Sequence, residues 1–167
     1  MTAAVPRVGS QAPDFVARNQ HGETVGLPDF RGRRDVVLVF YPYAFSGVCT
    51  SELTALRDRP DLAAAAEILA VSCDPMFTLR AYADSAGLEF SLLTDFWPHG
   101  SIASQYGVFD ADRGCAGRGT FVIDRAGVIR WSVVSGFTQA RDPDDYLRAL
   151  RNLRPGSASL ESHPRTL

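Results

Sequence analysis

A continuous apolar run at residues 36–41 is the feature that most limits how this chain can fold. The run reads Val-Val-Leu-Val-Phe-Tyr, which predicts a strand buried on both faces of a sheet. Pro42 ends that strand, because proline has no N–H to donate to a neighbouring strand. Leu53 and Leu56 follow at helical spacing, so a helix is expected to begin near Ser46 after a short loop.

Cys49 falls in the first turn of that expected helix, with Ser46 in the N-cap position. The positive end of the helix dipole and the unpaired N–H groups of the first turn both favour a thiolate there. A cysteine in a helix is otherwise a small buried hydrophobe. Its place after a buried strand nevertheless identifies Cys49 as a candidate nucleophile.

The remaining elements follow from periodicity and from the positions of proline and glycine. The pattern predicts a mobile lead-in at residues 1–13, then a hairpin formed by residues 14–18 and 24–27. The helix near Ser46 continues to about Arg59, where Pro60 breaks it. Residues 61–66 are expected to form another helical turn. Later strands are expected at residues 67–72, 91–94, 119–124 and 128–134, and later helices at 76–86, 102–106 and 142–153.

This order describes a single α/β domain at residues 1–153, followed by a tail at 154–167 that is expected to be disordered. The strand–helix–strand crossovers predict a parallel core, and the hairpins add antiparallel strands. We therefore expect a central mixed sheet with helices on both faces and an N-terminal β-hairpin. Cys49 then lies at the carboxyl end of a central strand, where open α/β sheets place their sites.

Charge and cysteine content exclude several function classes. The formal net charge of −2 gives no reason to expect nucleic acid or a membrane as partner, and no segment has the pattern of a signal peptide or membrane span. Three cysteines without a CxxC pair predict free thiols in a reducing compartment, hence a cytoplasmic protein. The three histidines have no metal-ligand spacing, so neither a metal nor a cofactor is expected.

Disulfide exchange is the first chemistry that a cysteine at a strand-to-helix junction suggests. That chemistry needs a second thiol three residues further on. Glu52 occupies that position, so the disulfide-exchange interpretation loses its key residue.

The stretch from Pro42 to Cys49, Pro-Tyr-Ala-Phe-Ser-Gly-Val-Cys, resembles the peroxiredoxin signature Pro-x-x-x-(Thr/Ser)-x-x-Cys. The similarity extends over residues 5–153 and includes Ala-Pro-Asp-Phe at 12–15 and Gly-Arg-Gly-Thr-Phe-Val-Ile-Asp at 117–124. Residues 95–100 and 106–109 resemble in particular the one-cysteine alkyl hydroperoxide reductase E (AhpE) subgroup of actinobacteria.

The resemblance implies a thioredoxin-like fold and a thiol-dependent peroxidase that acts on hydrogen peroxide, organic hydroperoxides and peroxynitrite. Cys49 would be the peroxidatic nucleophile, and Ser46 would place its hydroxyl beside the sulfur. Arg118 is read as the family's arginine, which holds both the thiolate and the peroxide oxygens. Pro42 would shield the thiolate from water, and Glu52 would orient Arg118.

The sulfenic acid that forms on Cys49 must then be reduced. One peroxiredoxin subgroup has a resolving cysteine five residues downstream, where this chain has Thr54; another has it near the C-terminus, where this chain has none after Cys115. This favours a one-cysteine mechanism with an external thiol, or a thioredoxin-like or glutaredoxin-like protein, as reductant. Cys73 is expected to serve packing, but a resolving role for Cys115 or Cys73 stays open.

Two other functions would use the same residues. A peroxide sensor would oxidise Cys49 once and pass the signal to a partner, and a thioredoxin-like holdase would use the fold only for binding. Turnover with a reducing system separates both from a peroxidase. The family resemblance also implies a homodimer or larger assembly, with the aromatic residues Phe45, Phe96 and Trp97 as candidate contacts.

Overall fold

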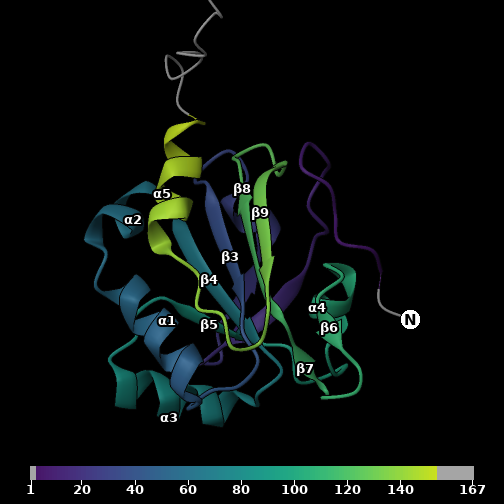
Figure 1. Cartoon of the computed structure of the whole chain (residues 1–167), viewed down its shortest axis with the longest axis vertical. Coiled ribbons are helices and arrows are strands. Elements are labelled where there is room, and N and C mark those ends of the chain that lie inside the picture. Colours follow the sequence, from purple (N-terminus) through teal and green to yellow (C-terminus); the bar gives the residue numbers. More distant parts are fainter. Residues whose placement is uncertain (1–2, 154–167) are drawn as a thin grey trace, which may run out of the picture.

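The computed structural model describes residues 3–153, and its centre is the strand formed by the apolar run (Figure 1). All five residues of this strand, β3 (Val36–Phe40), are buried. The other strands are β1 (Val16–Asn19), β2 (Thr24–Gly26), β4 (Glu67–Ser72), β5 (Ser91–Thr94), β6 (Phe109–Asp110), β7 (Cys115–Ala116), β8 (Arg118–Ile123) and β9 (Ile129–Ser135). The helices are η1 (Leu27–Phe30, a 3-10 helix), α1 (Gly47–Arg57), α2 (Pro60–Ala65), α3 (Met76–Ala86), α4 (Ser101–Gln105) and α5 (Pro143–Arg151).

Seven strands form one mixed sheet in the order β2-β1-β5-β4-β3-β8-β9. β3, β4 and β5 are parallel, as the crossovers require, and the two flanking hairpins are antiparallel. β8 pairs antiparallel with β3, with Val39 opposite Thr120. This pairing brings the start of β8 beside the end of β3, which leads into the Cys49 loop.

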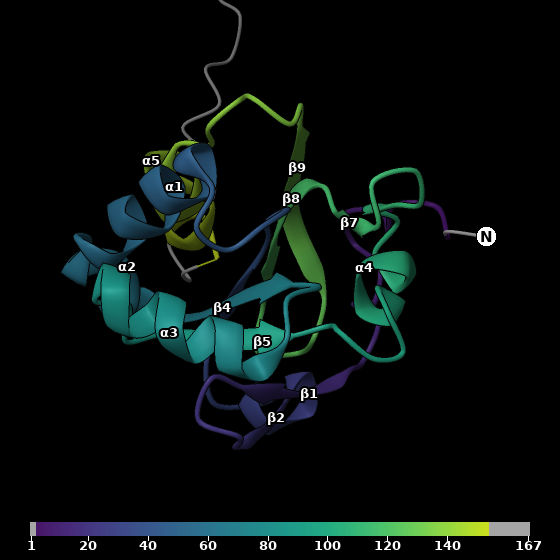
Figure 2. The same ribbon diagram turned by 90° about the horizontal axis from the view of Figure 1, so that it is seen from below.

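Alternate residues of β3 enter two separate hydrophobic cores, as the period of a strand dictates. Val37 and Val39 face a core shared with α1, α2, α3 and α5, whereas Leu38 and Phe40 face a core shared with α4. Figure 2 shows the four helices on one side of the sheet and α4 with the β6–β7 hairpin on the other. The predicted thioredoxin-like α/β fold, with helices on both faces, is therefore confirmed.

Several helix ends follow the sequence signals. Gly87 ends α3 in the left-handed conformation, at φ 67°. Asp142 caps α5, where its side chain accepts a hydrogen bond from the Asp144 N–H. No helix among residues 3–153 is long and apolar enough to cross a membrane.

Three expectations need correction. Residues 3–13 are not a free lead-in, because Gly9 and Ala12 donate backbone hydrogen bonds to Ile129 and Gly127 at 2.7 and 2.8 Å. The glycine-rich segment after α4 contains a short hairpin, β6–β7, that the sequence did not indicate. Element ends also shift by one or two residues: the first strand is Val16–Asn19 rather than 14–18, α4 begins at Ser101, and the last hairpin spans 118–123 and 129–135. The predicted disorder of residues 154–167 lies outside the described residues.

Candidate active site

Cys49 is the third residue of α1 and has no solvent-exposed surface. The chain leaves β3 at Tyr41, whose N–H still donates to Val71, and then passes through the buried Pro42. α1 begins where the sequence places it, and Thr50 N–H donates to the Ser46 carbonyl at 2.9 Å. The strand, the proline and the helix therefore fix the position of the sulfur near the carboxyl end of β3.

Arg118 lies at the start of β8 and reaches the sulfur directly. Its Nη2 atom is 3.3 Å from Cys49 Sγ, and both residues are buried. Its Nε atom donates to the Phe137 carbonyl at 2.6 Å, and this second hydrogen bond helps to fix the orientation of the guanidinium. The antiparallel pairing of β8 with β3 thus brings together two side chains that are 69 residues apart.

Glu52, one turn after Cys49, is the carboxylate that accepts from Arg118 Nη1. The contact places Glu52 where it can orient the guanidinium of Arg118. Burial acts to raise the pKa of Glu52, but hydrogen bonds and charge from Arg141, together with the charge of Arg118, outweigh burial and leave that pKa lowered. Glu52 is therefore held as a carboxylate.

Arg141 completes this buried network and was missed from the sequence. Its Nε and Nη2 atoms donate to the two Glu52 oxygens at 2.8 and 3.0 Å, and its backbone N–H donates to Glu52 at 2.7 Å. Its Nη1 atom donates to the Gly119 carbonyl and to the Thr120 hydroxyl. Arg141 immediately precedes the cap of α5 and is 89 residues from Glu52, so no local pattern distinguishes it from the chain's other arginines.

The charges of this network do not cancel. Arg118 and Arg141 contribute two positive charges and Glu52 one negative charge, which leaves one positive charge among three buried side chains. A buried charge is stable only if a partner neutralises it. A thiolate at Cys49, in contact with Arg118, would supply that missing negative charge.

Ser46 occupies the N-cap position of α1, but its side chain does not cap the helix. Its Oγ atom is buried and has no hydrogen-bond partner among the described residues. Ser46 thus lies at the predicted N-cap position, but its hydroxyl does not act as a cap. A buried hydroxyl without a partner is costly, and a bound ligand would satisfy it.

The loop between Pro42 and Ser46 is anchored on its neighbours. Asp74, just after β4, accepts from the Ala44 N–H at 2.9 Å and from the Ser72 hydroxyl at 2.7 Å. Phe45 has a φ of 68°, an unfavourable value for a bulky residue. The centroid of its ring lies 4.9 Å from the ring centroid of Tyr82 on α3. Strain of this kind is concentrated at functional sites.

The other two cysteines are buried free thiols. Cys73 follows β4, and burial raises its pKa to about 12. Cys115 lies in β7 rather than in an irregular loop, and burial raises its pKa as well. No group of residues able to hold a metal ion occurs between residues 3 and 153.

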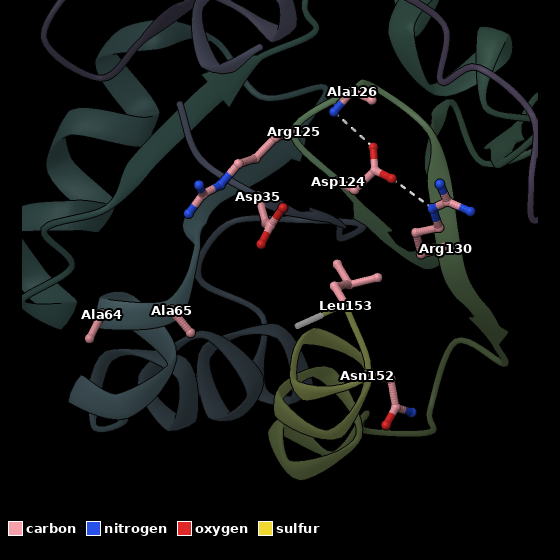
Figure 3. Close-up of a pocket in the computed structure, with 9 residues that line it drawn as sticks. All are labelled: Asp35, Ala64, Ala65, Asp124, Arg125, Ala126, Arg130, Asn152 and Leu153. Atoms are coloured by element: carbon pink, nitrogen blue, oxygen red, sulfur yellow. Dashed lines mark hydrogen bonds and ion pairs between the residues drawn. The ribbon is translucent and has the colours of Figure 1, made fainter. Parts of the chain in front are cut away.

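A surface cleft of about 680 Å³ lies away from Cys49, between the β8–β9 turn, α2 and the end of α5 (Figure 3). Of its two acidic residues, Asp124 accepts hydrogen bonds from Arg130 at 2.6 Å and from the Ala126 N–H at 2.9 Å. No residue of the Cys49 network lines this cleft. It is therefore separate from the thiol site.

Comparison with known proteins identifies the family to which this chain belongs. The AhpC/TSA family model matches residues 8–132. The chain is a peroxiredoxin of the AhpC/TSA family. This peroxiredoxin is 44% identical over 152 residues to alkyl hydroperoxide reductase E of Mycobacterium tuberculosis, covering 87% of the chain and 97% of that relative. It is 34% identical to the chloroplastic 2-Cys peroxiredoxin BAS1 of Hordeum vulgare, covering 96% of the chain and 88% of the relative.

Solved structures agree with this assignment. The peroxidoxin BcpB of Mycobacterium tuberculosis matches with a TM-score of 0.79 at 28% identity, over 89% of this chain and 98% of that one. The reduced 2-Cys peroxiredoxin of Plasmodium vivax matches with a TM-score of 0.78 at 30% identity, over 87% and 81%. The peroxiredoxin described here is thus a thiol-dependent peroxidase, as the resemblance implied.

Proposed function

We propose that this peroxiredoxin reduces hydrogen peroxide, organic hydroperoxides and peroxynitrite at Cys49, as part of antioxidant defence. The observation that carries the proposal is the contact between Arg118 Nη2 and Cys49 Sγ at 3.3 Å, beside the unpartnered Ser46 hydroxyl. One group is a positively charged guanidinium, and the other is a hydroxyl donor without a partner among the described residues.

In the proposed reaction the Cys49 thiolate attacks one peroxide oxygen in line with the O–O bond. The S–O bond forms, the O–O bond breaks, and negative charge develops on the departing oxygen. Arg118 and Ser46 stabilise that charge. With a hydroperoxide, a proton completes water or an alcohol as the leaving group; with peroxynitrite, the leaving group is nitrite. Glu52 and Arg141 position Arg118, and Pro42 limits access of water. The oxidised product is a Cys49 sulfenic acid.

Stopped-flow oxidation of Cys49 by hydrogen peroxide, an organic hydroperoxide and peroxynitrite tests this proposal. We expect rates far above that of free cysteine, with no reaction in Cys49→Ser. A rate no greater than that of free cysteine would refute the activated site. Sustained turnover with added thiol would distinguish a peroxidase from a sensor, which would consume a single equivalent of peroxide.

We further propose that an external thiol, or a thioredoxin-like or glutaredoxin-like protein, supplies the reducing electrons. Three free cysteines fit a reducing compartment, and so a cytoplasmic protein. Turnover measured with a low-molecular-weight thiol, a thioredoxin and a glutaredoxin in parallel would identify the reductant class. A lack of turnover with all three would contradict the proposal.

We also propose that the protein forms a homodimer. Phe45, Phe96 and Trp97 are 55%, 49% and 84% exposed, and large exposed apolar side chains are common at interfaces. Sedimentation analysis should show a dimer that Trp97→Glu weakens, whereas Val134→Glu, at an exposed site on the edge strand β9, should leave it intact. A monomer at all concentrations would contradict the proposal.

A further inference from the structure

The Phe137 carbonyl, which accepts the hydrogen bond from Arg118 Nε at 2.6 Å, lies beyond the end of the sheet. β9 ends at Ser135, which is the strand partner of Arg118 and lies two residues before Phe137. A turn follows, in which the Gln139 N–H donates to the Gly136 carbonyl at 3.0 Å. Any further restraint on the Phe137 carbonyl therefore has to come from outside the sheet.

Arg113, in the turn between β6 and β7, supplies such a restraint. Its guanidinium lies over the face of the Phe137 ring, with Cζ 4.2 Å from the ring centroid. Arginine stacks on aromatic rings in this way because its planar cation is weakly hydrated and is attracted by the negative face of the ring. The stack joins the β6–β7 hairpin to the segment whose carbonyl holds Arg118.

Arg113 is itself held in place by Asp110, the last residue of β6. The Asp110 carboxylate accepts from Arg113 Nη1 at 2.9 Å and from the Arg113 N–H at 3.0 Å. The Gly114 N–H donates to the Asp110 carbonyl at 2.8 Å, which closes the turn. An exposed ion pair adds little stability by itself, but together with the turn it restricts the conformations of the arginine side chain.

The backbone of Arg113 also contacts the loop that leads to Cys49. The Arg113 carbonyl accepts a hydrogen bond from the Tyr43 hydroxyl at 3.2 Å, and Tyr43 directly follows Pro42. Arg113 thus contacts both segments that form the site. Its carbonyl binds the loop before the thiol, and its guanidinium stacks on the residue that orients the active-site arginine.

We propose that Arg113 and Phe137 form a clamp that positions Arg118 for the reaction at Cys49. This inference rests on the proposed peroxidase function. The stack fixes Phe137, and the Phe137 carbonyl then keeps the guanidinium turned so that Nη2 faces the sulfur. Without the stack, Arg118 is aligned for a smaller part of the time with the sulfur and the departing oxygen, and a misaligned donor stabilises the transition state less. Arg113 and Phe137 are therefore positioning residues.

The test is stopped-flow oxidation of Cys49 at low hydrogen peroxide concentrations, in the fully reduced, full-length protein and in variants of the clamp. Arg113→Ala should lower the rate constant about two- to fivefold, the size expected when one exposed cation–π contact is lost. Phe137→Leu keeps an apolar side chain without a ring and should slow the reaction by the same factor. Phe137→Tyr keeps the ring and should react at the wild-type rate. The double variant Arg113→Ala/Phe137→Leu should be no slower than either single variant, because both remove one contact.

A second comparison shows whether the clamp acts through Arg118. Arg118→Lys keeps a positive charge but lacks the Nε–H that donates to the Phe137 carbonyl. Arg113→Ala should therefore slow the wild-type protein but should not slow Arg118→Lys any further. Equal slowing in both backgrounds, or a wild-type rate in Arg113→Ala, would overturn the inference.

Arg148→Ala is the matched control, because Arg148 also forms an exposed ion pair with an aspartate three residues earlier, Asp145, at 2.9 Å. It should react at the wild-type rate, and slowing equal to that of Arg113→Ala would overturn the inference as a general effect of lost charge. Urea unfolding shows whether each variant is folded. If Phe137→Leu is not, Arg113→Ala still decides the matter, because the Arg113 side chain is 57% exposed.

The clamp and the peroxidase proposal fail in different ways. Oxidation of the wild-type protein no faster than that of free cysteine would count against the peroxidase proposal itself. Fast oxidation of the wild type that is matched by Arg113→Ala would count against the clamp alone.

Discussion

Ser46 is the side chain whose role depends most directly on a ligand, because its buried hydroxyl has no partner in the described structure. We expect Ser46→Ala to slow Cys49 oxidation about 100-fold, the usual cost of removing one donor to a developing negative charge. Ser46→Thr keeps the hydroxyl and should retain most of the rate. Stopped-flow measurements with hydrogen peroxide compare the two. Equal rates for Ser46→Ala and wild type would show that the hydroxyl does not take part.

Glu52 makes stability depend on pH, because its pKa is lowered in the folded chain. Its contribution is complete above the ordinary value of 4.5 and is lost as the pH falls through the lower folded value. Replacing one partner of a buried ion pair costs about 3 kcal/mol, so Glu52→Gln should lose about that much at pH 7. The variant should also lose much of the acid sensitivity that wild type shows below about pH 4.

Urea unfolding at pH 7 and about pH 3 measures both effects. Glu67→Gln is a matched control, because Glu67 pairs with Arg34 at 3.7 Å in a partly exposed position. It should cost well under about 1 kcal/mol. Equal losses in the two variants would contradict the assignment of a buried network to Glu52.

The sequence was sufficient for the residues that belong to one local pattern, and it failed for Arg141. Pro42, Ser46 and Cys49 lie within one loop and one helical turn, so spacing alone predicts their proximity. Arg118 could be matched only through a resemblance over a longer segment. Arg141 approaches Glu52 because α5 packs back onto the sheet, and nothing in its neighbouring residues records that contact.

The secondary-structure elements show the same division. β4, α3 and β5 have the predicted bounds. An apolar run before Asp74-Pro75 defines β4, and Gly87 closes α3. β6 and β7 have two residues each and are surrounded by glycine, aspartate and arginine, so no periodicity can appear in them. They exist because the folded sheet gives them a surface to lie on.

The register between β3 and β8 positions the active site as much as any single residue does. Arg118 opens β8, and Val39 to Val36 lie opposite Thr120 to Ile123. Successive side chains of a strand point to opposite faces, so a slip of one residue would turn Arg118 away from Cys49. The same sheet could thus form without forming the site.

α5 supports the site through its cap, since Arg141 directly precedes Asp142. Replacing a capping aspartate with alanine costs about 1 kcal/mol, so Asp142→Ala should lower the free energy of unfolding by that amount. Asp142→Asn can still accept the Asp144 N–H and should be close to wild type. Chemical denaturation compares the three proteins. An unchanged stability in Asp142→Ala would show that the cap is not needed to hold this end of α5.

The molecule as a whole buries its reactive sulfur, with no surface of Cys49 open to water. Hydrogen peroxide is larger than water, so we infer that the loop between Pro42 and Ser46 moves before each reaction. The observed rate constant for Cys49 oxidation should therefore rise with peroxide concentration and then level off at the rate of opening. Stopped-flow traces over a wide range of peroxide concentrations would show this, and a strictly linear dependence would contradict it.

That plateau has a consequence for how the protein behaves under stress. Below the plateau, the rate of Cys49 oxidation rises with the peroxide concentration. At the plateau, that rate equals the rate at which the loop opens and no longer depends on the peroxide concentration. A sudden excess of peroxide could then oxidise the population no faster than the molecules open.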